Sequence, residues 1–192
     1  MGTINEALTF DDVLMLPRYS NILPSNTNIS LKLTNKINLK VPFLSSAMDT
    51  VTESNMAIAM AAAGGIGIIH RNLKIKNQSE EIKKVKGKNF LVGAAIGTNQ
   101  EDLERARSLL DNGVDLIVID TAHGHSAKVL KILSKLKKLN SKTPVCVGNI
   151  ATGEAAKKLY NSGADIIKVG IGPGSICTTR LVAGIGVPQI SA

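Results

Sequence analysis

Short apolar runs alternate with helix-like segments along most of this chain, and this alternation limits the possible folds more than any other feature. The apolar runs, which we expect to be strands, lie at 41–45, 66–70, 90–96, 116–120, 145–148 and 166–170. Helical periodicity marks the segments at about 53–63, 77–86, 100–111, 126–138 and 153–162. Strands that alternate with helices through short connections predict a parallel sheet with helices packed against it.

Local signals support individual helices in this pattern. Thr98 and Glu101 have the spacing of a capping box ahead of the segment 100–111. Three glycines follow helical segments where a left-handed cap is needed, about fifty residues apart: Gly64, Gly113 and Gly163. That interval corresponds to two βα units. An eight-stranded barrel and an open doubly wound sheet both have this pattern.

Polar or glycine-rich clusters follow nearly every expected strand, at Ser45–Asp49, His70–Asn72, Asp120–His123, Gly148-Asn149 and from Gly170 onward. Barrel enzymes build their active sites at the C-terminal ends of several strands. A doubly wound domain concentrates its signal in a glycine-rich turn after the first strand, and no Gly-x-Gly-x-x-Gly opens a helix there. The clusters therefore favour an α/β fold of the (β/α)8 TIM-barrel type.

We expect residues 1–192 to form one catalytic domain that contains about the first six βα units of the barrel. Because a complete barrel usually needs about 250 residues, we expect the remaining strands to lie outside this sequence or on another polypeptide. Ahead of the first strand, Ile29, Leu31 and Leu33 alternate with polar residues. This alternation predicts a hairpin able to close the barrel floor.

Composition and charge narrow the class of protein. Hydrophobic residues make up 44% of the chain, enough for a full core. The formal net charge is +8, but the excess lies in lysines along two expected helices, without interleaved aromatic residues on which bases could stack. Nucleic acid is therefore not an expected partner. No apolar run is long enough to span a membrane, and no signal-peptide pattern is present, so we expect a cytoplasmic protein without membrane contact.

The loop Gly170–Cys177 has three alternate glycines, then a serine and a cysteine. Glycine lets a ligand approach the main chain closely, and such a loop has N–H groups free for a phosphate and carbonyls free for a cation. Cys177 beside this cradle is a candidate nucleophile. The alternative is a glycine-rich turn with an inert cysteine. Cys146 lies inside an apolar strand, where we expect a core residue with a free thiol.

Five motifs, in order and over nearly the whole chain, resemble those of the inosine 5′-monophosphate dehydrogenase family, particularly its bacterial members. They are Leu8–Leu14, Ser45–Glu53, Gly65–Asn72, Ile119–Ser126 and Gly170–Arg180. The resemblance implies NAD-dependent oxidation of IMP to XMP in guanine nucleotide biosynthesis, through a covalent cysteine thioimidate.

The resemblance also implies residue roles. Cys177 would attack C2 of the purine, and Thr179 would position or deprotonate the hydrolytic water. Binding of IMP is implied for Ser175, Ser46 and Met48. Binding of NAD is implied for Asp120, Asn149, Gly170, Ile171 and Gly172, with Lys168 close by. A K⁺ site is implied at the carbonyls of Gly172, Gly174 and Cys177, with further ligands from a neighbouring subunit, and hence a homotetramer.

From the residues alone, structural roles remain open for four of these side chains. Thr179 and Ser46 could act as caps, Met48 could fill the core, and Lys168 could fill a polar layer of the barrel.

Two departures from the family are expected to matter. The family's pair of regulatory CBS modules is absent near residues 86–89, where Lys84–Phe90 joins a helix directly to the next strand. We therefore expect no nucleotide regulation through such modules. The C-terminal strands and the mobile flap, with its water-activating arginine, lie outside the sequence, so the chain alone is expected to be catalytically incomplete.

Three alternatives stay open. His123 and His125 form a His-x-His, which binds metal in barrel metallohydrolases, although there it typically lies on the first strand. GMP reductase, which uses NADPH, shares the barrel, the cysteine and the Gly-Pro-Gly-Ser loop and lacks CBS modules; Ala122–Gly124 and His70–Asn72 look more like the dehydrogenase. The third alternative is a catalytically silent half-barrel.

Overall fold

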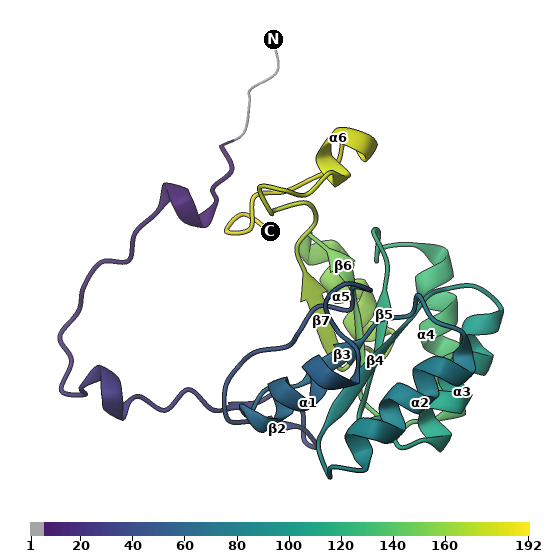
Figure 1. The fold of residues 1–192 in the computed structure, drawn as a ribbon. Coiled ribbons are helices and arrows are strands. Elements are labelled where there is room, and N and C mark those ends of the chain that lie inside the picture. The colour runs from purple at the N-terminus through teal and green to yellow at the C-terminus, as the bar shows by residue number, and fades with distance from the viewer. Residues whose placement is uncertain (1–5) are drawn as a thin grey trace.

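Helices and strands alternate in the computed structural model, which describes residues 6–192 (Figure 1). The main strands are β3 (Gly67–Ile69), β4 (Val92–Ile96), β5 (Leu116–Asp120), β6 (Val145–Ile150) and β7 (Ile166–Val169). The α-helices are α1 (Ser54–Ala62), α2 (Ile75–Lys86), α3 (Glu101–Asp111), α4 (Ala127–Leu139), α5 (Gly153–Asn161) and α6 (Thr179–Ala183). All five helices expected from periodicity are present. The first five residues of the expected domain lie outside the described residues.

The main sheet is parallel throughout, with the strand order β3-β4-β5-β6-β7. A doubly wound sheet reverses its strand order at a switch point, which opens a ligand crevice. Here each strand lies beside its successor, and helices cover the outer face of the sheet (Figure 1). This arrangement confirms the α/β class and the partial (β/α)8 barrel, and it excludes the doubly wound alternative.

The expected strand at 41–45 was wrong in its extent. Only Leu44 makes a parallel bridge, to Ile66. Pro42 has no N–H for a sheet ladder, which explains why the run does not pair along its length. The segment still lies beside β3, because the Ser45 N–H donates to the Ile66 carbonyl at 3.1 Å. It therefore occupies the place of the barrel's first strand as irregular chain.

A small antiparallel hairpin, β1 (Leu31–Lys32) and β2 (Asn38–Leu39), precedes this segment, as predicted. Ile37 and Leu39 are buried in a cluster with inner-face residues of the sheet, among them Ile68 and Leu116. The hairpin thus seals one end of the sheet's inner face. Ile29 lies outside the hairpin and is exposed.

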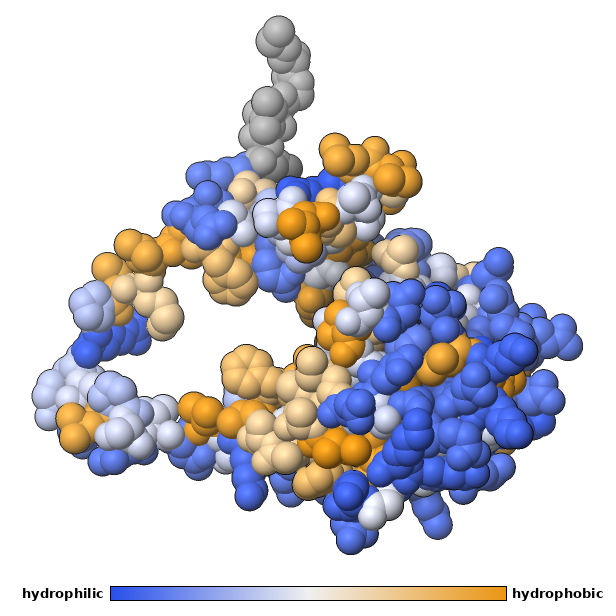
Figure 2. Space-filling view, in the orientation of Figure 1, coloured by the Kyte–Doolittle hydropathy of each residue, from blue (hydrophilic) through white to orange (hydrophobic). Residues whose placement is uncertain are grey.

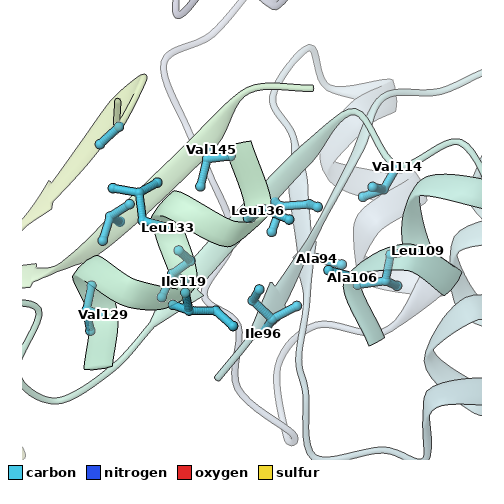
Figure 3. Close-up of a cluster of buried hydrophobic side chains, with 14 of the residues drawn as sticks. Ala94, Ile96, Ala106, Leu109, Val114, Ile119, Val129, Leu133, Leu136 and Val145 are labelled. Atoms are coloured by element: carbon cyan, nitrogen blue, oxygen red, sulfur yellow. The ribbon is translucent and has the colours of Figure 1, made fainter. Parts of the chain in front are cut away.

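The larger core lies between the sheet and its outer helices. Figure 3 shows Val129, Leu133 and Leu136 of α4 among side chains of the strands, including Ile119 and Val145. All five are at most 1% exposed. Truncating a leucine in such a place to alanine costs about 2–5 kcal/mol, since the cavity that remains collapses only in part.

The prediction of a capping box at Thr98 and Glu101 is wrong. Helix α3 has Gln100 at its N-cap position, and no side chain caps it there. Asp102, in the first turn, instead accepts the N–H groups of two residues that precede the helix, Gly97 at 3.0 Å and Asn99 at 2.8 Å. The three predicted glycine caps are correct, with φ between 78° and 96°.

The surface of the molecule has a hydrophilic region and an apolar region. The face over α2, α3 and α4 is largely hydrophilic in Figure 2, and most of the lysines on these helices are exposed, as expected. Apolar side chains gather instead on the N-terminal segment that arches away from the sheet, where Leu14, Met15 and Leu16 are exposed (Figures 1 and 2). Within residues 6–192, no helix is long and apolar enough to cross a membrane.

Candidate active site

A cleft of about 280 Å³ lies where β7 ends and the glycine loop begins. It is lined by six residues to which the sequence assigned site roles: Asn149, Gly170, Ile171, Gly172, Cys177 and Thr179. Asn149 comes from the end of β6, and the others follow β7. The cleft therefore opens at the C-terminal ends of neighbouring strands, where barrel enzymes carry their chemistry.

Cys177 and Thr179 are directly paired in this cleft. The Cys177 Sγ lies 3.3 Å from the Thr179 Oγ1. Hydrogen bonds from the hydroxyl and then the backbone N–H of Thr179 lower the pKa of the Cys177 thiol from its usual value, and the charge of Arg180 adds to this effect. Because the thiolate is the nucleophilic form, the arrangement favours reactivity at this half-buried sulfur.

Asn149 fixes the start of the glycine loop. Its Nδ2 donates to the Gly170 carbonyl at 2.9 Å, while the Gly170 N–H donates to the Ile150 carbonyl at 2.8 Å. The Asn149 Oδ1 is buried and, within the described part of the chain, has no hydrogen-bond partner. A buried unpaired acceptor is costly. In a cleft, it is a ready partner for the N–H of a ligand.

Gly170 shows why this loop needs glycine. Its φ is +129°, and a Cβ added there would lie 2.5 Å from the Oε1 of Gln189. Gln189 also lines the cleft, and its Nε2 donates to the Val169 carbonyl at 3.3 Å. Sequence reasoning missed Gln189, because it comes from an irregular segment, 184–192, that no motif spacing connects to Cys177.

Asp120 and Met48 line a different and larger cavity, of about 820 Å³. It lies at the C-terminal ends of β3 and β5, and Arg71 and Arg105 also line it. Asp120 ends β5 and accepts from Lys168 Nζ at 2.9 Å. This ion pair joins the strand that carries Asp120 to the strand that leads into the cysteine loop.

Arg105 is the second residue that sequence reasoning missed. It is 6% exposed, and its Nη1 donates to the Leu73 carbonyl and to the Gln78 Oε1, both at 2.9 Å. Gln78, fully buried, donates in turn to the carbonyls of His70 at 3.0 Å and Ala95 at 2.9 Å. The one available signal was the spacing of Asp102 and Arg105, three residues apart on the apolar side of α3.

Two predicted substrate residues, Ser46 and Ser175, are exposed and line neither of these two cavities. The Gly174 carbonyl, predicted as a K⁺ ligand, accepts from the Cys177 N–H at 3.1 Å and from Arg180 Nη2 at 3.0 Å. A cation at this carbonyl would therefore have to displace the guanidinium of Arg180.

The structure gives no support to a histidine metal centre. The rings of His123 and His125 have centroids 6.4 Å apart. Across the described residues, no group of three or more His, Cys, Asp or Glu side chains is placed to hold a metal ion.

Cys146 is buried in the core, as expected. Burial raises the pKa of its thiol to about 12. A buried thiol in that state is inert at ordinary pH, so the two cysteines lie in different environments, with pKa values shifted in opposite directions.

Comparison with known proteins identifies the family of this chain. A family model described as "IMP dehydrogenase / GMP reductase domain" matches residues 7–192. The inosine-5′-monophosphate dehydrogenase of Cryptosporidium parvum is 46% identical across the whole chain, which corresponds to 58% of that relative. The enzyme of the same name from Borreliella burgdorferi is 44% identical over 97% of the chain and 59% of the relative. The one from Aquifex aeolicus is 34% identical over 98% of the chain and 65% of the relative.

The chain thus spans about three fifths of the length of these curated relatives. The family match extends over almost every residue described, and it includes both the cysteine cleft and the Asp120 cavity. The chain belongs to the IMP dehydrogenase / GMP reductase family.

Proposed function

We propose that this chain supplies the nucleophile and part of the NAD site of an enzyme that oxidises IMP to XMP. The observation that carries the proposal is the pairing of Cys177 with Thr179 beside the glycine loop, which lowers the pKa of the thiol. The relatives named above support the choice of IMP as the substrate.

The reaction divides into two stages at Cys177. In the first, the thiolate attacks C2 of the hypoxanthine ring, and C2 then loses hydride, which leaves a thioimidate on the cysteine. In the second, water adds to C2 and the thiolate departs, giving XMP. Together, IMP, NAD⁺ and water give XMP, NADH and a proton, so atoms and electrons balance. Thr179 stabilises the thiolate before attack, and its hydroxyl is near enough to the sulfur to guide the incoming water.

Residues of the cleft fit a nicotinamide cofactor. The unpaired Asn149 Oδ1 matches a carboxamide N–H, and the backbone at Gly170 and Gly172 allows close approach of a flat ring. The carboxylate of Asp120, which is held by Lys168, would accept hydrogen bonds from the hydroxyl groups of a ribose. When bound, NAD supplies the hydride acceptor.

The remaining assignments belong to the same proposal. Ser46, Met48 and Ser175 contact IMP, and K⁺ binds at the carbonyls of Gly172, Gly174 and Cys177 once Arg180 releases Gly174. The active form is a homotetramer, in which neighbouring copies cover the exposed apolar side chains of α6, Leu181 and Val182.

The decisive experiment uses the complete natural protein that contains this chain. NADH formation from IMP is measured beside NADPH consumption with GMP, and the protein is quenched during turnover for peptide mass spectrometry. We expect NADH formation, a purine adduct on Cys177, and a loss of about a thousandfold or more in kcat for Cys177→Ser. NADPH consumption with GMP alone would instead assign the reductase, which the family description also names. Undiminished turnover of Cys177→Ser would refute the mechanism.

A further inference from the structure

Thr52 occupies an unusual place in the loop Ser45–Thr52, which precedes α1. Ser46 and Met48, the two residues of this loop proposed to contact IMP, are both exposed. Thr52, only a few residues later, is 0% exposed. A fully buried hydroxyl must have protein partners, because an unpaired one costs about 1–3 kcal/mol. Its partners identify its role.

The N–H and the hydroxyl of Thr52 both donate back to the loop. The Thr52 N–H donates to the Met48 carbonyl at 3.0 Å, and the Thr52 hydroxyl donates to the Ser46 carbonyl at 2.6 Å. The Ser46 carbonyl also accepts from the Met48 N–H at 2.9 Å. One residue therefore holds the main chain of both proposed IMP contacts, without lying at the surface itself.

The same residue attaches the loop to the sheet. The Thr52 carbonyl accepts from the His70 N–H at 3.4 Å, at the end of β3. The Thr52 Oγ1 lies 2.9 Å from the Ser45 Oγ, which accepts from the Ile68 N–H at 3.3 Å. The position of the loop is thus set from β3 through the paired hydroxyl groups of Thr52 and Ser45.

We propose that Thr52 is a positioning residue for IMP: its hydroxyl fixes the carbonyl of Ser46, and so the placement of Ser46 and Met48, relative to β3. This inference rests on the proposed function, in which these two residues contact the nucleotide. Thr52 itself touches no substrate. It should therefore act on the binding of IMP and leave the chemistry at Cys177 unchanged.

Three variants of the complete natural protein test this role. Thr52→Val keeps the shape and removes the hydroxyl, and Thr52→Ser keeps the hydroxyl and removes the methyl. Ser79→Ala is the matched control, because Ser79 is 4% exposed and, among the described residues, its hydroxyl is bonded only to the Ser108 hydroxyl, at 2.8 Å, between α2 and α3. For each protein, the Kd for IMP is measured directly, with KM for both substrates, kcat, melting temperature and the rate of Cys177 alkylation.

We expect Thr52→Val to raise the Kd and KM for IMP about tenfold, the effect of losing one hydrogen bond. The KM for NAD, kcat and the alkylation rate should stay within about twofold. Thr52→Ser should restore IMP binding to within about threefold of the unchanged protein, although it loses buried methyl contacts. Ser79→Ala should lower the melting temperature without changing IMP binding.

Equal IMP binding by Thr52→Val and the unchanged protein would overturn the inference, as would an equal loss of IMP binding in Ser79→Ala. If Thr52→Val does not fold, failure of Thr52→Ser to bind IMP normally would overturn it as well. The proposed function fails separately, if the unchanged protein binds IMP but forms no NADH. An unchanged protein that does not bind IMP would refute both.

Discussion

Lys168 Nζ on β7 lies 2.9 Å from Asp120 Oδ1 on β5, so this ion pair crosses the end of the intervening strand β6. Both side chains are partly exposed, at 44% and 26%. Water screens such pairs, and we expect little contribution to stability. The consequence of the contact is orientation, because it holds the carboxylate proposed to receive the NAD ribose.

Replacing Lys168 should therefore affect the cofactor rather than the fold. Lys168→Met leaves Asp120 without its cationic partner, and we expect the KM for NAD to rise about tenfold while the KM for IMP stays unchanged. Lys137→Met is the control, since Lys137 forms a comparable pair with Asp165 away from both cavities. Steady-state kinetics of the complete protein give both constants. A similar change in both variants would argue against a role in orientation.

The two cysteines should differ in their alkylation by iodoacetamide over pH. The pKa of Cys177 lies below the ordinary value of 9.0 and that of Cys146 lies at about 12. Below pH 9, Cys177 therefore has the larger thiolate fraction and should react first, while Cys146 remains unmodified in the folded chain. Peptide mass spectrometry after timed quenching resolves the two sites.

Thr179→Val tests the cause of the shift at Cys177. Loss of the hydroxyl removes the largest contribution to the lowered pKa, so the midpoint of the alkylation profile should move to higher pH. The reaction at pH values below the midpoint should slow several-fold. A profile that stays in place would assign the low pKa to Arg180 or to the backbone instead.

Arg105 should be needed for stability. It is buried beside Asp102, with Arg105 Nε 3.5 Å from Asp102 Oδ1. Arg105→Met removes the charge that faces a buried carboxylate and leaves the Gln78 Oε1 without its donor, so we expect a loss of about 3 kcal/mol in the free energy of unfolding. Urea unfolding of the chain measures this. Lys83→Met, which breaks a surface pair with Glu80, should have little effect.

The K⁺ prediction can be tested through Arg180. Its Nη2 donates a hydrogen bond to the Gly174 carbonyl at 3.0 Å, so a cation must compete with the guanidinium for this oxygen. In Arg180→Ala, we expect K⁺ to raise the melting temperature of the complete protein more than it does in the unchanged protein, with Na⁺ as the control. If both proteins respond equally to the two ions, the prediction that K⁺ binds at this loop is wrong.

Much of the fold was predictable from the sequence, because periodicity and helix-end glycines are local signals. Helices α1 to α5 lie within two residues of their expected ends, and Gly64 and Gly163 have the positive φ that their positions require. The exceptions come from competition between local groups. Pro42 interrupts the first strand, and α3 begins after Gln100 rather than Thr98, while Asp102 binds the N–H groups of the loop before the helix.

The site was predictable only where a motif carried it. Cys177 and Thr179 come from one motif and Asn149 from the polar cluster after the preceding strand, and they meet in one cleft because β6 and β7 are neighbours. Gln189 and Thr52 have no such signal. The contact of Gln189 with Gly170 depends on how the segment 184–192 folds back, and the importance of Thr52 appears only once its burial is known.

Strand β7 has a strand neighbour only on its β6 side within the described residues. At the end of β7, the Gln189 side chain donates a hydrogen bond to the Val169 carbonyl. The outward edge of a parallel strand can nevertheless pair with a second strand along its length. Concentrated or heated solutions of this chain by itself should therefore lose protein to intermolecular aggregation that starts at β7. Storage at low concentration, or a lysine introduced on that edge, should delay this aggregation.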